Sequence, residues 1–207
     1  MAQLRTRGRR IVEAHLQNTG IRAMTGSMVA YEGQVQFKSA GMGGGDGVMA
    51  GLRRRASGES LSFMECMGHG VVYLAVDAQD TTLVDLNNET LQVESRQLLA
   101  LAGNLRTDIR FTGLRGASTG QGLFTTTVSG QGQVALLSAG GPLIALEVSG
   151  QFPLVVDPDA FVAAKGNVNQ SFITDVSWAA VLGEGSGEPF SLRWDGTGVV
   201  YIQPAER

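Results

Sequence analysis

The chain has 207 residues, of which 29 are glycine, 43% are hydrophobic and 17% are charged. Its single cysteine, Cys66, excludes an internal disulfide framework and a cysteine-based zinc finger. The formal net charge of -3 argues against a protein that coats nucleic acid by charge alone. No apolar run reaches the ~18 residues of a membrane-spanning helix. We therefore expect a folded, cytoplasmic protein with enough residues for a sizeable core.

The chain begins with a basic segment, residues 1–10, which carries four arginines and no acidic residue. The apolar stretch that follows the basic start of a signal peptide is missing here. The arginines and the lack of a hydrophobic pattern predict a frayed, solvated tail in front of the folded part.

Residues 38–60 form a glycine- and arginine-rich segment that we expect to be a loop. Its centre, GMGGGDGVMAG (41–51), lacks the lysine and Ser/Thr of a phosphate-binding loop. Arg53, Arg54 and Arg55 follow directly, and such a cluster could contact a phosphate or an anionic lipid headgroup. The competing interpretation is a solvated loop end whose arginines pair with nearby glutamates.

Two sequence patterns recur at intervals of 62 to 66 residues. The first, G-x-G-x-V-x-[LI], occurs as GHGVVYLA (68–75), GQGQVALL (130–137) and GTGVVYIQ (196–203). The second occurs as MVAYEGQVQF (28–37), LQVESRQLLA (91–100) and LVVDPDAFVA (154–163). Because two separate patterns share nearly the same spacing, we interpret them as a threefold internal repeat.

Both patterns are typical of β-strands joined by turns. Side chains alternate along a strand, so the two glycines of the first pattern face one side and the residue between them faces the other. We therefore predict an all-β fold of three tandem units, each a β-sandwich or a double-stranded β-helix, in a pseudo-threefold arrangement. The predicted units span roughly residues 20–82, 83–145 and 146–207 and pack into a single compact body.

The segments GSMVAYEGQVQF (26–37), GLRRRASGESLSF (51–63) and LVVDPDAFVA (154–163), together with the glycine pairs, resemble the altered inheritance of mitochondria protein 24 family. The resemblance covers about residues 20–204. It implies a fold like that of the trp RNA-binding attenuation protein, with three such units in a chain and three chains in a ring. The family has no agreed catalytic residues, so the resemblance implies none here.

His69 is the strongest candidate for catalysis or metal binding, with Glu65 and Cys66 just before it. Its counterparts in the repeat are Gln131 and Thr197, and a general base or metal ligand could not be replaced by threonine. We therefore interpret His69 as a surface residue and Cys66 as a buried, unreactive thiol. The sequence predicts no catalytic residue, no metal site and no cofactor.

These observations favour a non-catalytic, oligomeric β-scaffold, a homotrimer, that contacts a protein or a membrane surface. Arg53, Arg54 and Arg55 are the candidate contact residues. The alternative is a ring-forming binding protein for RNA or a small ligand. Only 6% aromatic residues and two lysines argue against RNA, because single strands need stacking platforms and basic grooves. An enzyme of unrecognised type is the third hypothesis.

Overall fold

The computed structural model describes residues 2–41, 62–115, 121–174 and 190–205, and most of these residues lie in β-strands. The strands are β1 (Gln3–Arg7), β2 (Ile11–Met24), β3 (Met28–Gly41), β4 (Phe63–Leu74), β5 (Asp80–Glu94), β6 (Leu98–Arg115), β7 (Gln121–Ser138), β8 (Ile144–Val148), β9 (Leu154–Val156), β10 (Phe161–Thr174) and β11 (Phe190–Ile202), with a 3-10 turn, η1 (Ser95–Gln97), before β6. The predicted all-β class is confirmed. Within these ranges, no helix has the length and apolar character needed to cross a membrane.

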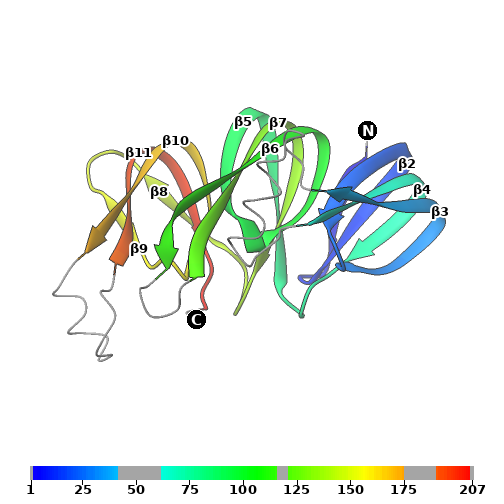
Figure 1. Cartoon of the computed structure of the whole chain (residues 1–207), viewed down its shortest axis with the longest axis horizontal. Helices are drawn as coiled ribbons and strands as arrows, with labels where there is room; N and C mark the ends of the chain where they lie inside the picture. Colours follow the sequence, from blue (N-terminus) through cyan, green and yellow to red (C-terminus); the bar gives the residue numbers. More distant parts are fainter. Residues whose placement is uncertain (1, 42–61, 116–120, 175–189, 206–207) are drawn as a thin grey trace.

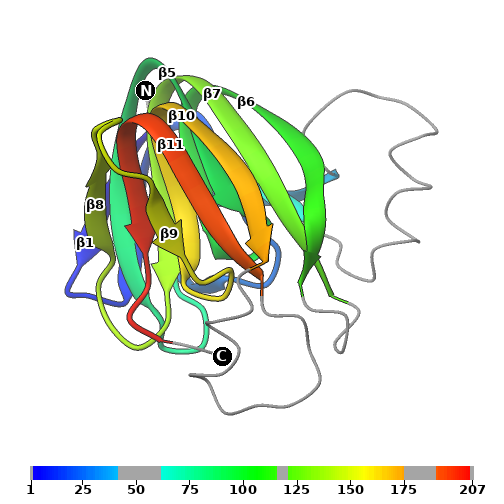
Figure 2. The same cartoon turned by 90° about the vertical axis from the view of Figure 1, so that its left-hand side faces the viewer.

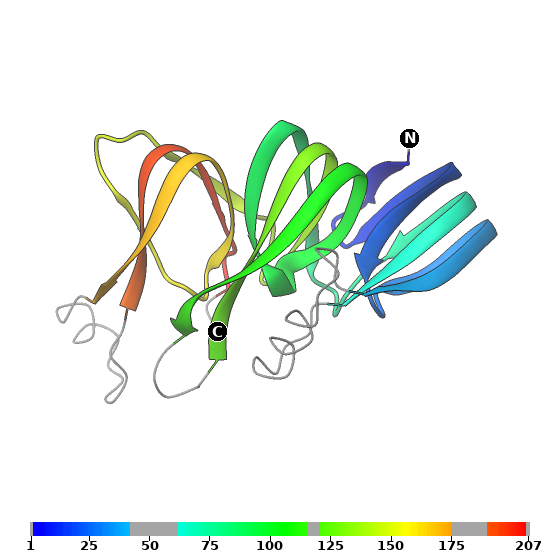
Figure 3. The ribbon, with the colours of Figure 1, turned by 45° about the horizontal axis from the view of Figure 1, so that its top comes forward.

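The strands gather into three groups that lie in a row (Figures 1 and 3). We name them module 1 (β1–β4), module 2 (β5–β7) and module 3 (β8–β11). In each module the last strand is central: β4 lies between β2 and β3, β7 between β5 and β6, and β11 between β10 and the two short strands β8 and β9. Viewed along the row, the strands of successive modules lie one behind another (Figure 2). The three modules therefore share one strand order, and the pseudo-threefold symmetry stays a prediction.

Glycines face each other at the same place in each module. The paired positions are Gly33 with Gly70, Gly103 with Gly132, and Gly166 with Gly198. Gly103 has a φ of +110°, and a Cβ atom there would lie 2.7 Å from the Gln131 carbonyl oxygen and 2.8 Å from the Gly132 Cα. Because glycine alone tolerates this conformation and this approach, the central strand can pass close to its neighbour.

The second sequence pattern has one member in the wrong place. Residues 91–100 and 154–163 each cover the end of one strand, a turn and the start of the next strand. Residues 28–37 lie wholly within β3, so they do not correspond to the other two segments. The matching segment is 21–30, which contains the end of β2, a tight turn and the start of β3. Sequence similarity alone did not reveal it, because its turn, residues 25–27, has the same length as the turn at 95–97 but a different sequence, TGS against SRQ.

The predicted unit starts at residues 20, 83 and 146 fall inside β2, β5 and β8. The modules are joined instead at the connections 75–79 and 139–143. The glycine pattern marks the middle of each central strand, and it carries no information about where a module begins.

Short runs of antiparallel pairing connect neighbouring modules. Ile21–Ala23 of β2 pairs with Ala100–Ala102 of β6, and Leu91–Val93 of β5 pairs with Ala163–Lys165 of β10. Each junction thus joins a strand that lies beside the central strand of one module (β2 or β5) to a strand that lies beside the central strand of the next module (β6 or β10). We call these two contacts the first and the second junction.

Each module encloses an apolar core, and a neighbouring module contributes to the cores of modules 1 and 2. The core of module 1 includes Leu99 from β6, and that of module 2 includes Phe63 from β4 and Val162 from β10. In module 3, Phe161 stacks on Trp194 with ring centroids 5.0 Å apart. Because burial of apolar surface is favourable, the cores of modules 1 and 2 are stabilised in part by side chains from the neighbouring module.

The frayed tail predicted for residues 1–10 is wrong, because this segment contains β1. Leu4 is 2% exposed, and its N–H donates a hydrogen bond to Gln133 Oε1 of β7 at 2.8 Å. Arg9 donates to the carboxylate of Asp80, which is 5% exposed, at 2.5 Å. The N-terminal segment therefore connects module 1 to module 2.

Candidate functional site

The predicted contact residues Arg53, Arg54 and Arg55 lie outside the described residues. So does most of the predicted loop 38–60, although β3 extends to Gly41 and occupies its first residues. The role of the arginine cluster stays a prediction from sequence.

His69 lies on an exposed strand surface, where it pairs with Gln17 of β2 and Gln34 of β3. Its counterparts Gln131 and Thr197 are exposed as well, as the alternation of side chains predicts. Among the described residues, no cluster of three or more His, Cys, Asp and Glu side chains could hold a metal ion. The position of His69 on an open sheet surface fits a surface residue.

Cys66 is fully buried in the core of module 1. Burial raises the pKa of its thiol to about 11, from an ordinary value of 9.0. Because the thiolate is the nucleophile, this environment suppresses cysteine chemistry. The prediction of a buried cysteine is confirmed.

Two strand edges at opposite ends of the row carry exposed apolar residues (Figure 1). On β3, Val29 is 58% and Tyr31 is 50% exposed, and on β9 Val155 is 50% exposed. Within the described part of the chain, β3 pairs with β4 alone and β9 with β11 alone. Each strand thus has one edge with which none of the other described strands pairs.

Val155 holds in module 3 the position that Arg22 holds in module 1 and Gln92 in module 2. Each of the three pairs with a residue of the central strand that lies three places before the first glycine of the G-x-G pattern. These central-strand residues are Glu65, Thr127 and Arg193. On their other side Arg22 and Gln92 pair with the next module. Val155 ends the row, and among the described strands none pairs with its outer edge.

Tyr31 is the counterpart at the other end. It lies two residues before a paired glycine, as do Leu101 and Ala164. Leu101 and Ala164 receive a strand from the preceding module and are 3% and 1% exposed. The two ends of the row therefore carry the strand positions that meet at the two internal junctions.

At the first junction the side chain of Arg22 reaches across to β6. Its guanidinium donates to the Leu105 carbonyl oxygen at 2.6 Å and to Thr107 Oγ1 at 3.2 Å. Burial lowers the pKa of the Arg22 guanidinium, and the negative charge of Glu65 opposes this shift. The first junction is therefore closed by a charged, hydrogen-bonded side chain.

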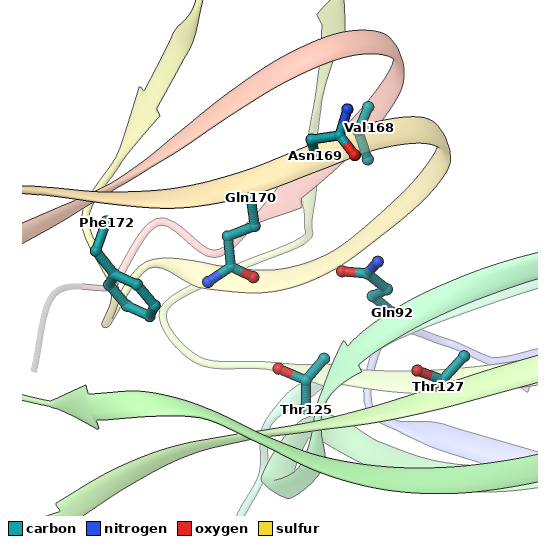
Figure 4. Close-up of a pocket in the computed structure, with 7 residues that line it drawn as sticks. All are labelled: Gln92, Thr125, Thr127, Val168, Asn169, Gln170 and Phe172. Atoms are coloured by element: carbon teal, nitrogen blue, oxygen red, sulfur yellow. The ribbon is translucent and has the colours of Figure 1, made fainter.

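The second junction holds a pocket of about 240 Å³ at the equivalent place (Figure 4). The pocket is lined by Gln92, Thr125, Thr127, Val168, Asn169, Gln170 and Phe172. Gln92 takes the place of Arg22, because the two residues pair with equivalent positions, Ala164 and Leu101, of the next module. Gln170 takes the place of Thr107, because Gln170 and Thr107 each lie four residues after the paired glycine of their strand. A shorter, neutral side chain thus replaces the arginine at this junction.

The amide of Gln170 points into the gap between β10 and the strands of module 2 (Figure 4). Its Nε2 atom is buried and has no hydrogen-bond partner in the described part of the chain. A buried amide donor without a partner costs about 1–3 kcal/mol. The pocket therefore contains a polar group that a ligand could satisfy.

Sequence analysis did not identify Gln92, Gln170 or Tyr31. Their significance depends on which strands pair across the junctions, and this is not visible in local patterns. The signal that could have found them is their fixed distance from the repeated glycines, once the register between strands is known.

The fold and these surfaces define an all-β protein of three linked modules with an open strand edge at each end. A family model described as mitochondrial biogenesis AIM24 matches residues 3–205, and the chain belongs to this family. The family resemblance in the sequence is thereby confirmed. The X-ray crystal structure of a Streptococcus pyogenes protein is similar at a TM-score of 0.73 and 21% identity, over 100% of this chain and 94% of that chain. That likeness shows the fold. No curated protein matches the chain.

Proposed function

We propose that this protein is a non-catalytic β-scaffold that assembles head to tail, with three chains in a closed ring. One observation carries the proposal: the free edges of β9 and β3 are the two halves of a junction that the chain already forms twice. A chain that repeats this junction between copies pairs β9 of one copy with β3 of the next. The number three follows from the ring that the family resemblance implies.

The register of the internal junctions fixes the register between copies. It places Val155 of one chain opposite Tyr31 of the next, with Leu154 opposite Glu32 and Val156 opposite Ala30. The surfaces that meet are different, so the interface is heterologous, and such interfaces give rings when the rotation closes. Pairing also covers two apolar edges that would otherwise promote aggregation.

We propose a non-catalytic role because of the environments of His69 and Cys66, the two residues that could carry catalysis. His69 is on an open sheet surface and Cys66 is a buried thiol with a raised pKa. Neither environment resembles a cleft in which a titratable group is tuned for reaction.

Arg53, Arg54 and Arg55 are the proposed contact with a protein or an anionic membrane surface. A trimer would display three such clusters together, so weak contacts could add up. Replacing all three with serine should reduce retention of the protein on anionic vesicles at low salt. Retention equal to that of the wild type would contradict this part of the proposal.

The assembly is tested by light scattering coupled to size exclusion, with absorbance recorded at 260 and 280 nm. The expected result is a single peak of about three times 21.8 kDa with a protein-like absorbance ratio. A monomeric mass at all concentrations would contradict the scaffold. Raised absorbance at 260 nm would instead favour the alternative of a ring that binds RNA or nucleotides.

A second candidate function, a binding protein for a small ligand, is favoured by the polar pocket at the second junction. This pocket lies within one chain, so it does not depend on assembly.

A further inference from the structure

We propose that the pocket at the second junction binds a neutral polyhydroxyl ligand of about one sugar residue. The proposal is independent of the scaffold, because the lining residues that the structure describes belong to modules 2 and 3 of the same chain.

Most of the described lining residues are polar, and none of them carries a charge. Five of the seven have amide or hydroxyl side chains, and the other two are Val168 and Phe172. Lys165, the basic residue on the same strand as Gln170, is not in the lining and pairs with Glu89 at 2.8 Å. A charged ligand would lose its hydration without gaining an opposite charge, and this is costly. The pocket therefore favours a neutral ligand.

The polar groups suit hydroxyls in particular. Amide and threonine side chains offer both donors and acceptors, and a hydroxyl group can serve either. The unpaired, buried Nε2 of Gln170 needs an acceptor, which a ligand hydroxyl oxygen provides. Gln92 and the two threonines come from module 2 and Gln170 from module 3, so such a ligand would contact both sides of the junction (Figure 4).

The apolar part of the lining suits the C–H faces of a sugar ring. Val168 is 8% exposed, and Phe172, at one end of the pocket, is 43% exposed (Figure 4). An aromatic ring gives a large apolar contact surface with a defined orientation. The volume of about 240 Å³ lies below the ~300–1,000 Å³ of pockets for drug-sized ligands, which limits the ligand to about one ring.

At the first junction, the equivalent place is filled by a side chain of the protein itself. There Arg22 reaches across from β2 and bonds to Leu105 and Thr107. At the second junction Gln92 and Gln170 replace Arg22 and Thr107, and the pocket is present instead. The chain itself therefore supplies the substitutions that should close the site without disturbing the fold.

The test is saturation-transfer NMR and calorimetry on the full chain with a panel of probes. The neutral probes are glucose, galactose, mannose and N-acetylglucosamine, and the charged ones are glucuronate and glucosamine. We expect saturable binding of at least one neutral sugar, with a Kd of ~1 mM or tighter, and weaker binding of its charged analogue. Absence of saturable binding by every neutral sugar would overturn the proposal, and preference for the charged probes would overturn the ligand class.

The double variant Gln92→Arg with Gln170→Thr rebuilds the first junction at the second. It should weaken sugar binding at least tenfold and leave the melting temperature unchanged or raised. Gln131→Arg, on an exposed surface of module 2, adds the same charge elsewhere and should bind like the wild type. If the double variant does not fold, Gln170→Met removes the amide at similar size and should give the same loss. Binding that survives in the folded variant would overturn the assignment of the site.

Discussion

Arg22 on β2 donates a hydrogen bond to the carbonyl oxygen of Leu105 on β6 at 2.6 Å, so one side chain joins module 1 to module 2. The two residues are 83 positions apart in the chain. The same guanidinium reaches Thr107, which is 7% exposed. Hydrogen bonds of a charged donor in a partly buried setting are stronger than neutral ones. Arg22 is therefore expected to contribute to stability through the junction.

Arg22→Met keeps the aliphatic part of the side chain and removes the guanidinium. The free energy of unfolding should fall by about 1.5–3 kcal/mol, because two acceptors on β6 lose a charged donor. Urea denaturation followed by fluorescence measures this change. Arg106→Met, at an exposed position on β6, should stay within about 0.5 kcal/mol of the wild type. Equal effects of the two substitutions would mean that the contact across the junction is not stabilising.

Gly103→Ala tests the close approach of the glycine-paired strands. The added methyl group would lie 2.7 Å from the Gln131 carbonyl oxygen, on a residue with φ of +110°. Strain and overlap together should cost about 3 kcal/mol or more. Gly8→Ala is the matched control, because Gly8 also has a positive φ, +63°, but no atom lies within 4 Å of the added methyl group. It should cost only about 1–2 kcal/mol, and thermal denaturation of both variants separates overlap from strain.

The parts of the fold that follow from local patterns could be predicted from sequence. Alternation around the glycine pairs indicated strands and placed His69 on an open surface, and the apolar residues around Cys66 predicted that it is buried. These properties depend on residues within one strand and its side-chain alternation. They need no knowledge of which strands are neighbours.

The rest depends on pairing between distant strands. β1 was missed because only one side chain of the strand, that of Leu4, is buried, and its arginines resemble those of a solvated tail. The junction residues Arg22 and Gln92 look like ordinary polar strand residues in sequence. Their different roles appear only when β6 and β10 are seen beside them.

The stability of the protein should fall at high pH because of Cys66. Burial raises the pKa of this thiol to about 11, against an ordinary value of 9.0. Above pH 9 the unfolded chain releases the thiol proton while the folded chain still holds it, so unfolding is favoured as the pH rises from 9 to 11. The contribution of Cys66 that is present below pH 9 is then lost, by up to ~2–3 kcal/mol.

Cys66→Ala is the variant that isolates this effect. The missing sulfur lowers its stability at every pH, but this stability should fall less steeply than that of the wild type between pH 9 and 11. Denaturant titrations at several pH values compare the two slopes. Parallel curves would show that the thiol does not titrate differently in the folded and unfolded chains.

The pairing of β9 with β3 of the next copy can be tested by exchanging two side chains for charges. Tyr31 and Val155 are each 50% exposed in the single chain, and the junction register places them opposite each other between copies. Tyr31→Lys or Val155→Glu alone would bury an unpaired charge at this contact, so each should weaken assembly at least ~10-fold, or by ~1.4 kcal/mol. Light scattering over a dilution series measures the change.

Tyr31→Lys combined with Val155→Glu should recover part of the loss, because opposite charges on directly opposed strand positions attract. Recovery is specific to this register, since Tyr31 on β3 and Val155 on β9 belong to the modules at opposite ends of the row (Figure 1) and can meet only between copies. Met67→Lys, on the central strand β4 where the side chain is 47% exposed, adds a charge away from both edges and should leave the mass unchanged. A double variant no better than the weaker single one would mean that the copies, if they associate, do so through another surface.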